Sequence, residues 1–275
     1  MPGYSIGTYG SRITQVAGSA ILLAAEAVRA KAVLLASDML EAAPTDLVVD
    51  NGQITVRGTP TRTISLSELA RIAEEHPDLI QHDAPNPANG TSVEGLAAWH
   101  DFRSPGATYS SGSHLAVVEI DPETGEVQVK AYFAVDDSGK ILNHYLVEAQ
   151  VHGGLAQGIR QALCEEVVYD QDGQLLTGSF MDYAMPNAEM FPDFVTDFIE
   201  TPSPYNPLGV KGAGESGCIG GPPAIVNAVL DALSPYGIKA IDMPLKPEKI
   251  WSLLQSARQG VSSDSSPVFW GIKEK

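Results

Sequence analysis

The sequence predicts an α+β protein of two lobes, in which long helices pack on mixed or antiparallel sheets. Apolar residues recur at helical spacing over residues 19–40 and 143–164 and predict two long helices. Alternating apolar runs at 114–120 and 127–135 flank a turn-rich connection, which predicts an antiparallel hairpin. The stretch 77–111 contains four prolines and many small or polar residues, which is typical of a connection between lobes.

These patterns divide the chain into four segments. Residues 1–76 form an N-terminal lobe segment that carries a glycine-rich loop and the first long helix. Residues 77–111 form the connection, and residues 112–258 form a C-terminal lobe. Residues 259–275 form a polar, serine-rich tail, which we expect to be mobile.

The N-terminal segment begins with a polar, glycine-rich loop over residues 3–11 that leads into the helix at 19–40. A helix N-terminus presents free N–H groups and a positive dipole end, which suit an anion such as phosphate. An ordinary helix start without a ligand is the alternative, and these residues by themselves favour it. Further on, Asn51-Gly52 predicts a hairpin of strands 47–49 and 54–56, and Ser65 with Glu68 predicts a capped helix to His76.

The predicted helix at 143–164 contains three glycines close together, Gly153, Gly154 and Gly158. Glycine inside a helix costs about 1 kcal/mol relative to alanine. We therefore expect this helix to pack closely against another backbone or a ligand. The elements predicted after it are a hairpin at 167–169 and 175–177, strands at 195–199 and 239–241, and helices at 222–233 and 247–258.

A second glycine-rich stretch surrounds a single acid, Glu215. Five glycines lie between Gly209 and Gly220, and Pro222-Pro223 predicts that a helix starts directly after them. Glycine allows backbone to approach a ligand closely, so such a loop can bring one carboxylate to a reacting group. Glu215 is therefore the first candidate for a catalytic residue.

The same stretch satisfies the dinucleotide-binding spacing Gly212-x-Gly214-x-x-Gly217. That motif requires a strand directly before its first glycine and a helix that begins inside it. Here several prolines separate the nearest predicted strand from Gly212, and Pro222-Pro223 places the predicted helix start after the motif. A nicotinamide or flavin site in this loop is therefore the weaker alternative.

Composition excludes several classes of protein. The formal net charge of −17 argues against binding to nucleic acid or to anionic membranes. Two cysteines are too few for a disulfide framework, and no 18-residue apolar run without charge is present. With no export signal at the N-terminus, we expect a cytoplasmic protein without a transmembrane segment.

Several stretches resemble the large, molybdenum-binding subunit of the xanthine dehydrogenase, aldehyde oxidase and carbon monoxide dehydrogenase family of molybdenum hydroxylases. They are GTYGSR (7–12), HLAVVEIDPETG (114–125), VEAQVHGGLAQG (147–158), NPLGVKGAGESG (206–217) and IDMPLKPEKIW (241–251). The resemblance covers only the C-terminal part of that subunit. It implies either a separately encoded subunit or a fragment of a longer gene.

The resemblance also implies cofactors and partners. The cofactor is molybdopterin with its molybdenum, and both the plain pterin and its cytosine dinucleotide form remain open. The implied partners are a chain that carries the N-terminal half of the molybdenum subunit, an iron–sulfur subunit, an FAD subunit and a small-molecule substrate. Iron–sulfur clusters and FAD belong to the partner subunits, because the four-cysteine sets that clusters need are absent from this sequence.

Residue roles carry over position by position. The resemblance implies that Glu215 is the catalytic base, and that Gln157 hydrogen-bonds oxygen at the molybdenum or the pterin. The loop Gly10, Ser11 and Arg12 holds the phosphate and pterin end of the cofactor, where N–H groups and a guanidinium suit phosphate. Lys211, Gly212, Ala213 and Gly214 line the pterin by main chain, and the Lys211 side chain reaches an acceptor. No residue of the chain is a metal ligand.

The function that the resemblance implies is oxidation of an aldehyde, of a purine or other N-heterocycle, or of carbon monoxide, with water as the oxygen source. The chain would be the cofactor-binding half of a multi-subunit enzyme, active with a partner chain. The alternative is a non-catalytic assembly or interaction subunit, or a truncated gene fragment that keeps the fold. The presence of Glu215 and Gln157 argues against a decayed remnant.

Overall fold

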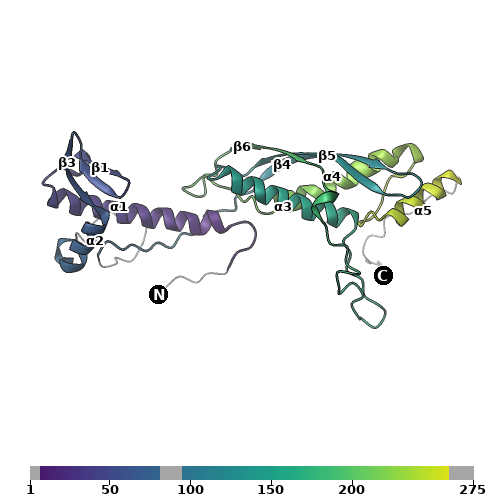
Figure 1. Cartoon of the computed structure of the whole chain (residues 1–275), viewed down its shortest axis with the longest axis horizontal. Coiled ribbons are helices and arrows are strands. Elements are labelled where there is room, and N and C mark those ends of the chain that lie inside the picture. The colour runs from purple at the N-terminus through teal and green to yellow at the C-terminus, as the bar shows by residue number, and fades with distance from the viewer. Residues whose placement is uncertain (1–6, 81–94, 260–275) are drawn as a thin grey trace. The chain divides into compact units, whose positions relative to one another are not determined.

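The computed structural model describes residues 7–80 and 95–259 and divides into two compact units (Figure 1). The first unit comprises the chain up to Ala107 together with Pro204–Leu208. The second unit comprises Thr108–Ser203 and the chain from Gly209 onward. Both units combine helices with a three-stranded sheet, which confirms the α+β class. The predicted tail lies outside the described residues, except for Gln259.

The first unit packs two helices with a small antiparallel sheet. Helix α1 spans Ser19–Met39, as predicted, and continues a short π-helical stretch, Thr14–Gly18. Helix α2 spans Leu66–Glu75, and the Ser65 hydroxyl caps it by accepting a hydrogen bond from the Glu68 N–H at 3.1 Å. The sheet consists of β1 (Leu47–Asp50), β2 (Gln53–Val56) and β3 (Thr59–Ser65) in that order. Two 3-10 turns complete the unit, Pro44–Asp46 and Pro77–Leu79.

Strand β3 is absent from the sequence-based prediction. Its residues, TPTRTIS, are mostly polar and exposed, so apolar alternation gives no signal there. Pairing with β2 makes it a strand, and its Ile64 is opposite Ile54. Ile54, Ile64, Leu35 of α1 and Leu69 of α2 belong to one buried apolar cluster, which forms the core of the first unit.

The sheet of the second unit has the order β4-β5-β6. Strands β4 (Ser111–Ile120) and β5 (Val127–Asp137) form the predicted antiparallel hairpin. Strand β6 (Phe194–Ile199) lies on the other side of β5 and runs parallel to it. A parallel neighbour requires a crossover connection, and helix α3 (His144–Leu163) lies within that connection. Asn143 caps α3, because its Oδ1 accepts from the Leu146 N–H at 3.1 Å.

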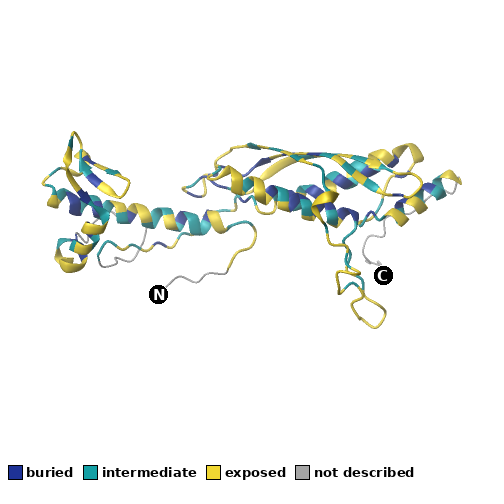
Figure 2. Cartoon of the chain, viewed as in Figure 1, coloured by how far each residue is buried: buried dark blue, intermediate teal, exposed yellow. Residues whose placement is uncertain are grey.

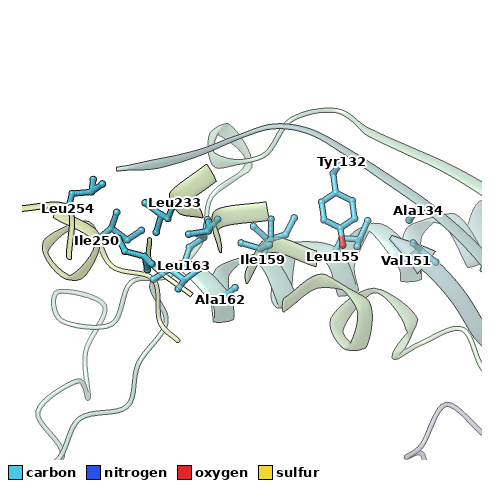
Figure 3. Close-up of a cluster of buried hydrophobic side chains, with 14 residues drawn as sticks. Tyr132, Ala134, Val151, Leu155, Ile159, Ala162, Leu163, Leu233, Ile250 and Leu254 are labelled. Carbon is cyan, nitrogen blue, oxygen red and sulfur yellow. The ribbon is translucent and has the colours of Figure 1, made fainter. Parts of the chain in front are cut away.

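Two further helices complete the second unit, α4 (Ser216–Leu233) and α5 (Pro247–Arg258). Figure 3 shows the core, in which Val151, Leu155 and Ile159 of α3 face Tyr132 and Ala134 of β5. Apolar residues of α4 and α5 join the same cluster, and Figure 2 shows where such buried residues lie along the elements. Short 3-10 turns occur at Ala188–Met190 and Ser234–Tyr236. Among the described residues, no helix is long and apolar enough to span a membrane.

Two local predictions for the second unit are wrong. Helix α4 begins at Ser216, not at residue 222, and it contains Pro222 and Pro223. Packing of its glycines against α3 holds the chain helical through the two prolines. Residues 239–241 form no strand, because no neighbouring strand pairs with them. The hairpin predicted at 167–177 is present in a short form: Tyr169 and Leu175 make an antiparallel bridge, and the Leu176 N–H donates to the Val168 carbonyl at 2.8 Å.

The outer face of this sheet exposes a row of apolar side chains. Leu115 is opposite Phe133, and Phe133 is opposite Val195 in the next strand. Their exposed fractions are 57%, 42% and 56%. Isolated exposed apolar residues are common on proteins, but a contiguous apolar surface marks an interaction site.

Candidate functional site

The glycine-rich loop that leads to Glu215 is anchored to the end of strand β5 by a buried carboxylate, Asp137. The Asp137 Oδ2 lies 2.8 Å from the Lys211 ammonium, and the side chains of this pair are 11% and 14% exposed. The other oxygen, Oδ1, accepts hydrogen bonds from the Gly139 N–H at 2.8 Å and from the Thr201 N–H at 3.1 Å. One carboxylate therefore joins three segments of the second unit.

Main-chain contacts reinforce this anchor. The Lys211 N–H donates to the Ser138 carbonyl at 2.7 Å, and the Lys140 N–H donates to the Gly209 carbonyl at 2.9 Å. A Cβ on Gly139 would lie 2.5 Å from the Gly209 carbonyl oxygen, and Gly139 has φ +68°. Only glycine allows these two backbone segments to approach so closely in this conformation. The Lys211 side chain is thus paired with Asp137, a residue of the chain itself.

Burial by itself would raise the pKa of Asp137. Hydrogen bonds from Lys211, Gly139 and Thr201 outweigh burial and hold the pKa at about 2, against an ordinary value of 3.8. The folded state therefore favours the ionised carboxylate, and this stabilisation is fully present above pH 4. It is lost as the pH falls through the interval between about 4 and 2.

Replacing Asp137 by asparagine tests the anchor. Asp137→Asn leaves the Lys211 ammonium without its counter-charge, so we expect the second unit to lose roughly 1–2 kcal/mol of stability at pH 7. We expect the difference from the wild type to shrink below pH 4, because Asp137 takes up a proton there in the unfolded chain while the folded chain keeps it ionised down to about pH 2. Urea unfolding of both proteins at pH 7 and pH 3 measures this. A difference that stays constant with pH would contradict the role of the charged carboxylate.

Glu215 stands directly before α4, at its N-cap position with φ −112° and ψ −4°. Its carbonyl accepts the Ile219 N–H at 3.0 Å, and the residue is exposed. The N-terminus of a helix favours a nearby negative charge. The anchored loop and the helix thus fix the backbone on both sides of this carboxylate.

Close packing of α3 on α4 places Gln157. A Cβ on Gly217 would lie 2.5 Å from the Leu155 nitrogen and 2.5 Å from the Val151 oxygen, and a Cβ on Gly158 would lie 2.8 Å from the Pro222 ring. Gly154 likewise meets the backbone of α4, at 3.0 Å from the Cys218 nitrogen. The close packing predicted for this helix is thus packing against another backbone.

The third glycine of that group, Gly153, behaves differently. It is exposed, and no atom lies within 4 Å of the position where its Cβ would be. Gln157, also exposed, lies four residues further along α3 and hence on the same side of the helix. This side of α3 offers open backbone beside an amide that can both donate and accept.

The glycine-rich loop of the first unit contains a left-handed turn. Gly10 and Ser11 both have left-handed conformations, with φ +59° and +52°, and nothing lies within 4 Å of the Cβ position of Gly10. Successive N–H groups in turn conformations form concavities that bind anions. The Arg12 guanidinium lies 5.0 Å from the centre of the Tyr9 ring and donates to its hydroxyl at 2.6 Å. A tyrosine therefore holds the cation in this loop.

The predicted site residues fall in both units. Lys211, Gly212, Ala213, Gly214 and Glu215 run into α4 in the second unit, which also contains Gln157. The loop of Gly10, Ser11 and Arg12 belongs to the first unit. Among the described residues, no group of three or more His, Cys, Asp or Glu side chains could hold a metal ion.

The dinucleotide motif lacks its structural context. Helix α4 does begin inside the motif, contrary to the prediction, but β6 ends at Ile199, well before Gly212. The segment between them is irregular apart from one bridge residue, Val210. The motif requires a strand that runs directly into its first glycine, and no strand does so at Gly212.

Sequence reasoning did not single out Asp137. The pair Asp136-Asp137 at the end of a predicted strand, directly before Ser138-Gly139, is the signal that could have indicated it. Two acids at the end of an apolar strand are unusual, because charged residues are rarely buried unless paired. The partner, Lys211, is 74 residues away in the sequence.

Comparison with known proteins gives a consistent result. A family model described as "Molybdopterin cofactor-binding domain" matches residues 1–192. The nicotine 6-hydroxylase large subunit of Paenarthrobacter nicotinovorans is 38% identical over 97% of this chain and 31% of its own length. The carbon monoxide dehydrogenase large chain of Hydrogenophaga pseudoflava is 38% identical over 92% of this chain and 30% of its own.

A solved structure agrees with these sequence matches. The quinoline 2-oxidoreductase from Pseudomonas putida 86 aligns with a TM-score of 0.77 and 36% identity, over 92% of this chain and 31% of that chain. The chain thus spans about a third of the length of the relatives that it matches.

Proposed function

Because the chain belongs to the family of molybdopterin cofactor-binding domains, we propose that it is the cofactor-binding part of a molybdenum hydroxylase, with Glu215 as its catalytic base. The anchored loop carries this proposal. Asp137 and Lys211 fix the chain before Gly212, and α4 fixes the chain after Glu215, so one carboxylate is held at an exposed helix N-terminus. A catalytic base needs such a defined position before it needs a tuned pKa.

The residues present fit the cofactor. The left-handed turn at Gly10 and Ser11 places the Arg12 cation in a glycine-rich loop, which suits a phosphate or pyrophosphate. This set suits both the plain pterin, which carries one phosphate, and the cytosine dinucleotide form. In the second unit, the open backbone at Gly153 and the amide of Gln157 suit a polar, planar group.

When bound, the molybdenum cofactor accepts the two electrons that leave the substrate. The role of this chain is to position groups around it. Glu215 takes a proton from the attacking water-derived oxygen, and Gln157 donates a hydrogen bond from its amide without adding charge. Main-chain groups of Lys211 to Gly214 contact the pterin, because the Lys211 ammonium is already paired with Asp137.

We propose that the substrate is an aldehyde, an N-heterocycle such as a purine, or carbon monoxide. The chain corresponds to about a third of its relatives, so the remaining part of the substrate site lies in the polypeptide that corresponds to the other two thirds. The exposed apolar face around Leu115, Phe133 and Val195 supports a contact with that polypeptide. Iron–sulfur and FAD subunits carry the electrons onward. The two free cysteines, Cys164 and Cys218, fit a reducing cytoplasm.

Molybdenum analysis tests the proposal. The chain is purified alone and together with the polypeptide that supplies the other two thirds, and molybdenum and pterin are quantified by mass spectrometry. We expect close to one molybdenum and one pterin per complex. A stable, well-folded complex that contains neither would overturn the proposal and leave a non-catalytic assembly subunit.

A matched pair of variants localises the cofactor. Arg12→Gln removes the cation beside the left-handed turn, so we expect cofactor occupancy to fall by about tenfold or more, as for loss of a charge-assisted hydrogen bond. Arg29→Gln removes an exposed cation from α1 and should leave occupancy unchanged. Equal occupancy in both variants would remove Arg12 from the cofactor site.

A further inference from the structure

A pocket of about 380 Å³ lies in the second unit, where the start of β4 meets helix α4. Polar groups from both elements and from β5 line it together with an apolar wall. The residues that matter for its chemistry are Ser111, His114, Asp136, Ser216, Ile219 and Asn227. None of the roles proposed above uses this pocket.

Three side chains form a buried polar chain beside it. The His114 Nδ1 lies 3.0 Å from the Tyr132 hydroxyl, and the His114 Nε2 lies 3.4 Å from the Asp136 Oδ1. The side chains of His114 and Asp136 are 6% and 3% exposed. Tyr132 is fully buried in the core of the unit.

Tyr132 closes the inner end of this chain. Burial, and then the charge of Asp136, raise the pKa of Tyr132, so its hydroxyl keeps its proton. A histidine ring nitrogen that carries a proton donates, and a carboxylate oxygen accepts, so His114 is a donor to the Asp136 Oδ1 when its Nε2 is protonated. The second carboxylate oxygen of Asp136 lies outside this chain of contacts.

Two oxygens at the pocket have no partner among the described residues. The Asp136 Oδ2 and the Ser216 Oγ are buried and make no hydrogen bond to any atom of residues 7–80 and 95–259. Each such group costs about 1–3 kcal/mol if it stays unsatisfied, and more if it is charged. A carboxylate this deeply buried requires a donor.

Two glycines keep room for this arrangement. A Cβ on Gly220 of α4 would lie 2.4 Å from ring atoms of His114, and a Cβ on Gly112 would lie 2.3 Å from the Asp136 Oδ1. The His114 ring therefore packs directly on the backbone of α4. A larger residue at position 220 would clash with the His114 ring, and one at position 112 would clash with the Asp136 carboxylate.

We propose that this pocket binds a protonated nitrogen group, an alkylammonium or a guanidinium, with Asp136 as its counter-charge. The Ser216 hydroxyl accepts a second hydrogen bond from the same group, and Ile219 contacts its carbon atoms. A carboxylate opposite a guanidinium or ammonium forms charge-assisted hydrogen bonds, which are roughly twice as strong as neutral ones. The nitrogen belongs either to a free small molecule or to a lysine or arginine of another polypeptide.

Nuclear magnetic resonance titration of the full chain tests the binding, with methylammonium and methylguanidinium as probes. We expect saturable amide shifts confined to residues 111–114 and 216–220. Acetate, the anionic control, should produce none. Asp136→Asn should weaken binding at least tenfold, whereas Asp231→Asn, which removes an exposed charge from α4, should leave it unchanged. If Asp136→Asn does not fold, Ser216→Ala takes its place as the test variant and should weaken binding about fivefold.

The source of the nitrogen is decided in the complex with the other two thirds of the enzyme. Loss of probe binding in the complex, with protection of the same amides, indicates a lysine or arginine of that polypeptide. Probe binding that persists in the complex indicates a free ligand. Shifts that do not saturate, or that are equal in wild type and Asp136→Asn, would overturn the proposal and leave water as the partner of both oxygens.

Discussion

Replacing Glu215 by glutamine should abolish turnover while leaving the cofactor in place. Glutamine keeps the size of the side chain and its place before α4, but its amide cannot take a proton. General base catalysis contributes roughly 10²- to 10⁴-fold to a rate, so kcat should fall by about that factor. KM should change little, since the carboxylate acts on the attacking oxygen. Steady-state assays with an aldehyde, an N-heterocycle and carbon monoxide, each with an artificial electron acceptor, measure the change.

The control for this variant is Glu123→Gln, which removes an exposed carboxylate from the turn between β4 and β5. It should retain full activity. The loss of activity reports on proton transfer only if the Glu215→Gln complex contains as much molybdenum as the wild type. Full activity in Glu215→Gln would contradict its role as base, and loss of molybdenum together with activity would assign it to cofactor binding.

Replacing Gly217 by alanine should destabilise the second unit by about 1–3 kcal/mol. The new Cβ would meet backbone atoms of α3 on two sides, at 2.5 Å from the Leu155 nitrogen and the Val151 oxygen. Backbone cannot turn aside as a flexible side chain can, so the two helices must move apart. Because α3 carries Gln157 and α4 carries Glu215 at its start, the same shift should also lower the cofactor content of the complex.

Gly153→Ala provides the matched control. Its Cβ would meet nothing within 4 Å, so it should stabilise α3 by up to about 1 kcal/mol. Urea unfolding, followed by the circular dichroism of the helices, compares the two variants. If Gly153→Ala gains stability but lowers cofactor content, the open side of α3 contacts the cofactor. Equal stability of Gly217→Ala and wild type would contradict the close packing of α3 on α4.

The sequence predicted the helices with strong local signals. The capping residue Ser65 fixed the start of α2, because a cap acts within three residues of itself. The start of α3 was predicted from apolar spacing, and the structure adds Asn143 as its cap. Helix α5 begins and ends at Pro247 and Arg258, as predicted. The start of α4 was predicted six residues too late, because two prolines are a strong local signal and packing against a second helix overrides them.

The candidate site was predicted only in part. Glycine spacing pointed to Glu215 and to close packing of α3, since both depend on residues that are neighbours in the sequence. Asp137 was missed, because a buried carboxylate needs an ionic partner. That partner is Lys211, which only the fold brings next to it. The sequence also left open which glycines of α3 face backbone and which are open, since that depends on how the helix is rotated.

By itself, the amino-acid sequence determined the α+β class and the long helices, because periodicity and caps are local properties. The family followed from the resemblance of five motifs, and Glu215 as the base stays a prediction. The tertiary structure decided the parallel pairing of β6, the early start of α4, the Asp137–Lys211 anchor and the polar chain from Tyr132 to Asp136. Each of these joins residues that are distant in the sequence. Their free energy comes from burial and from partners that exist only once the chain has folded.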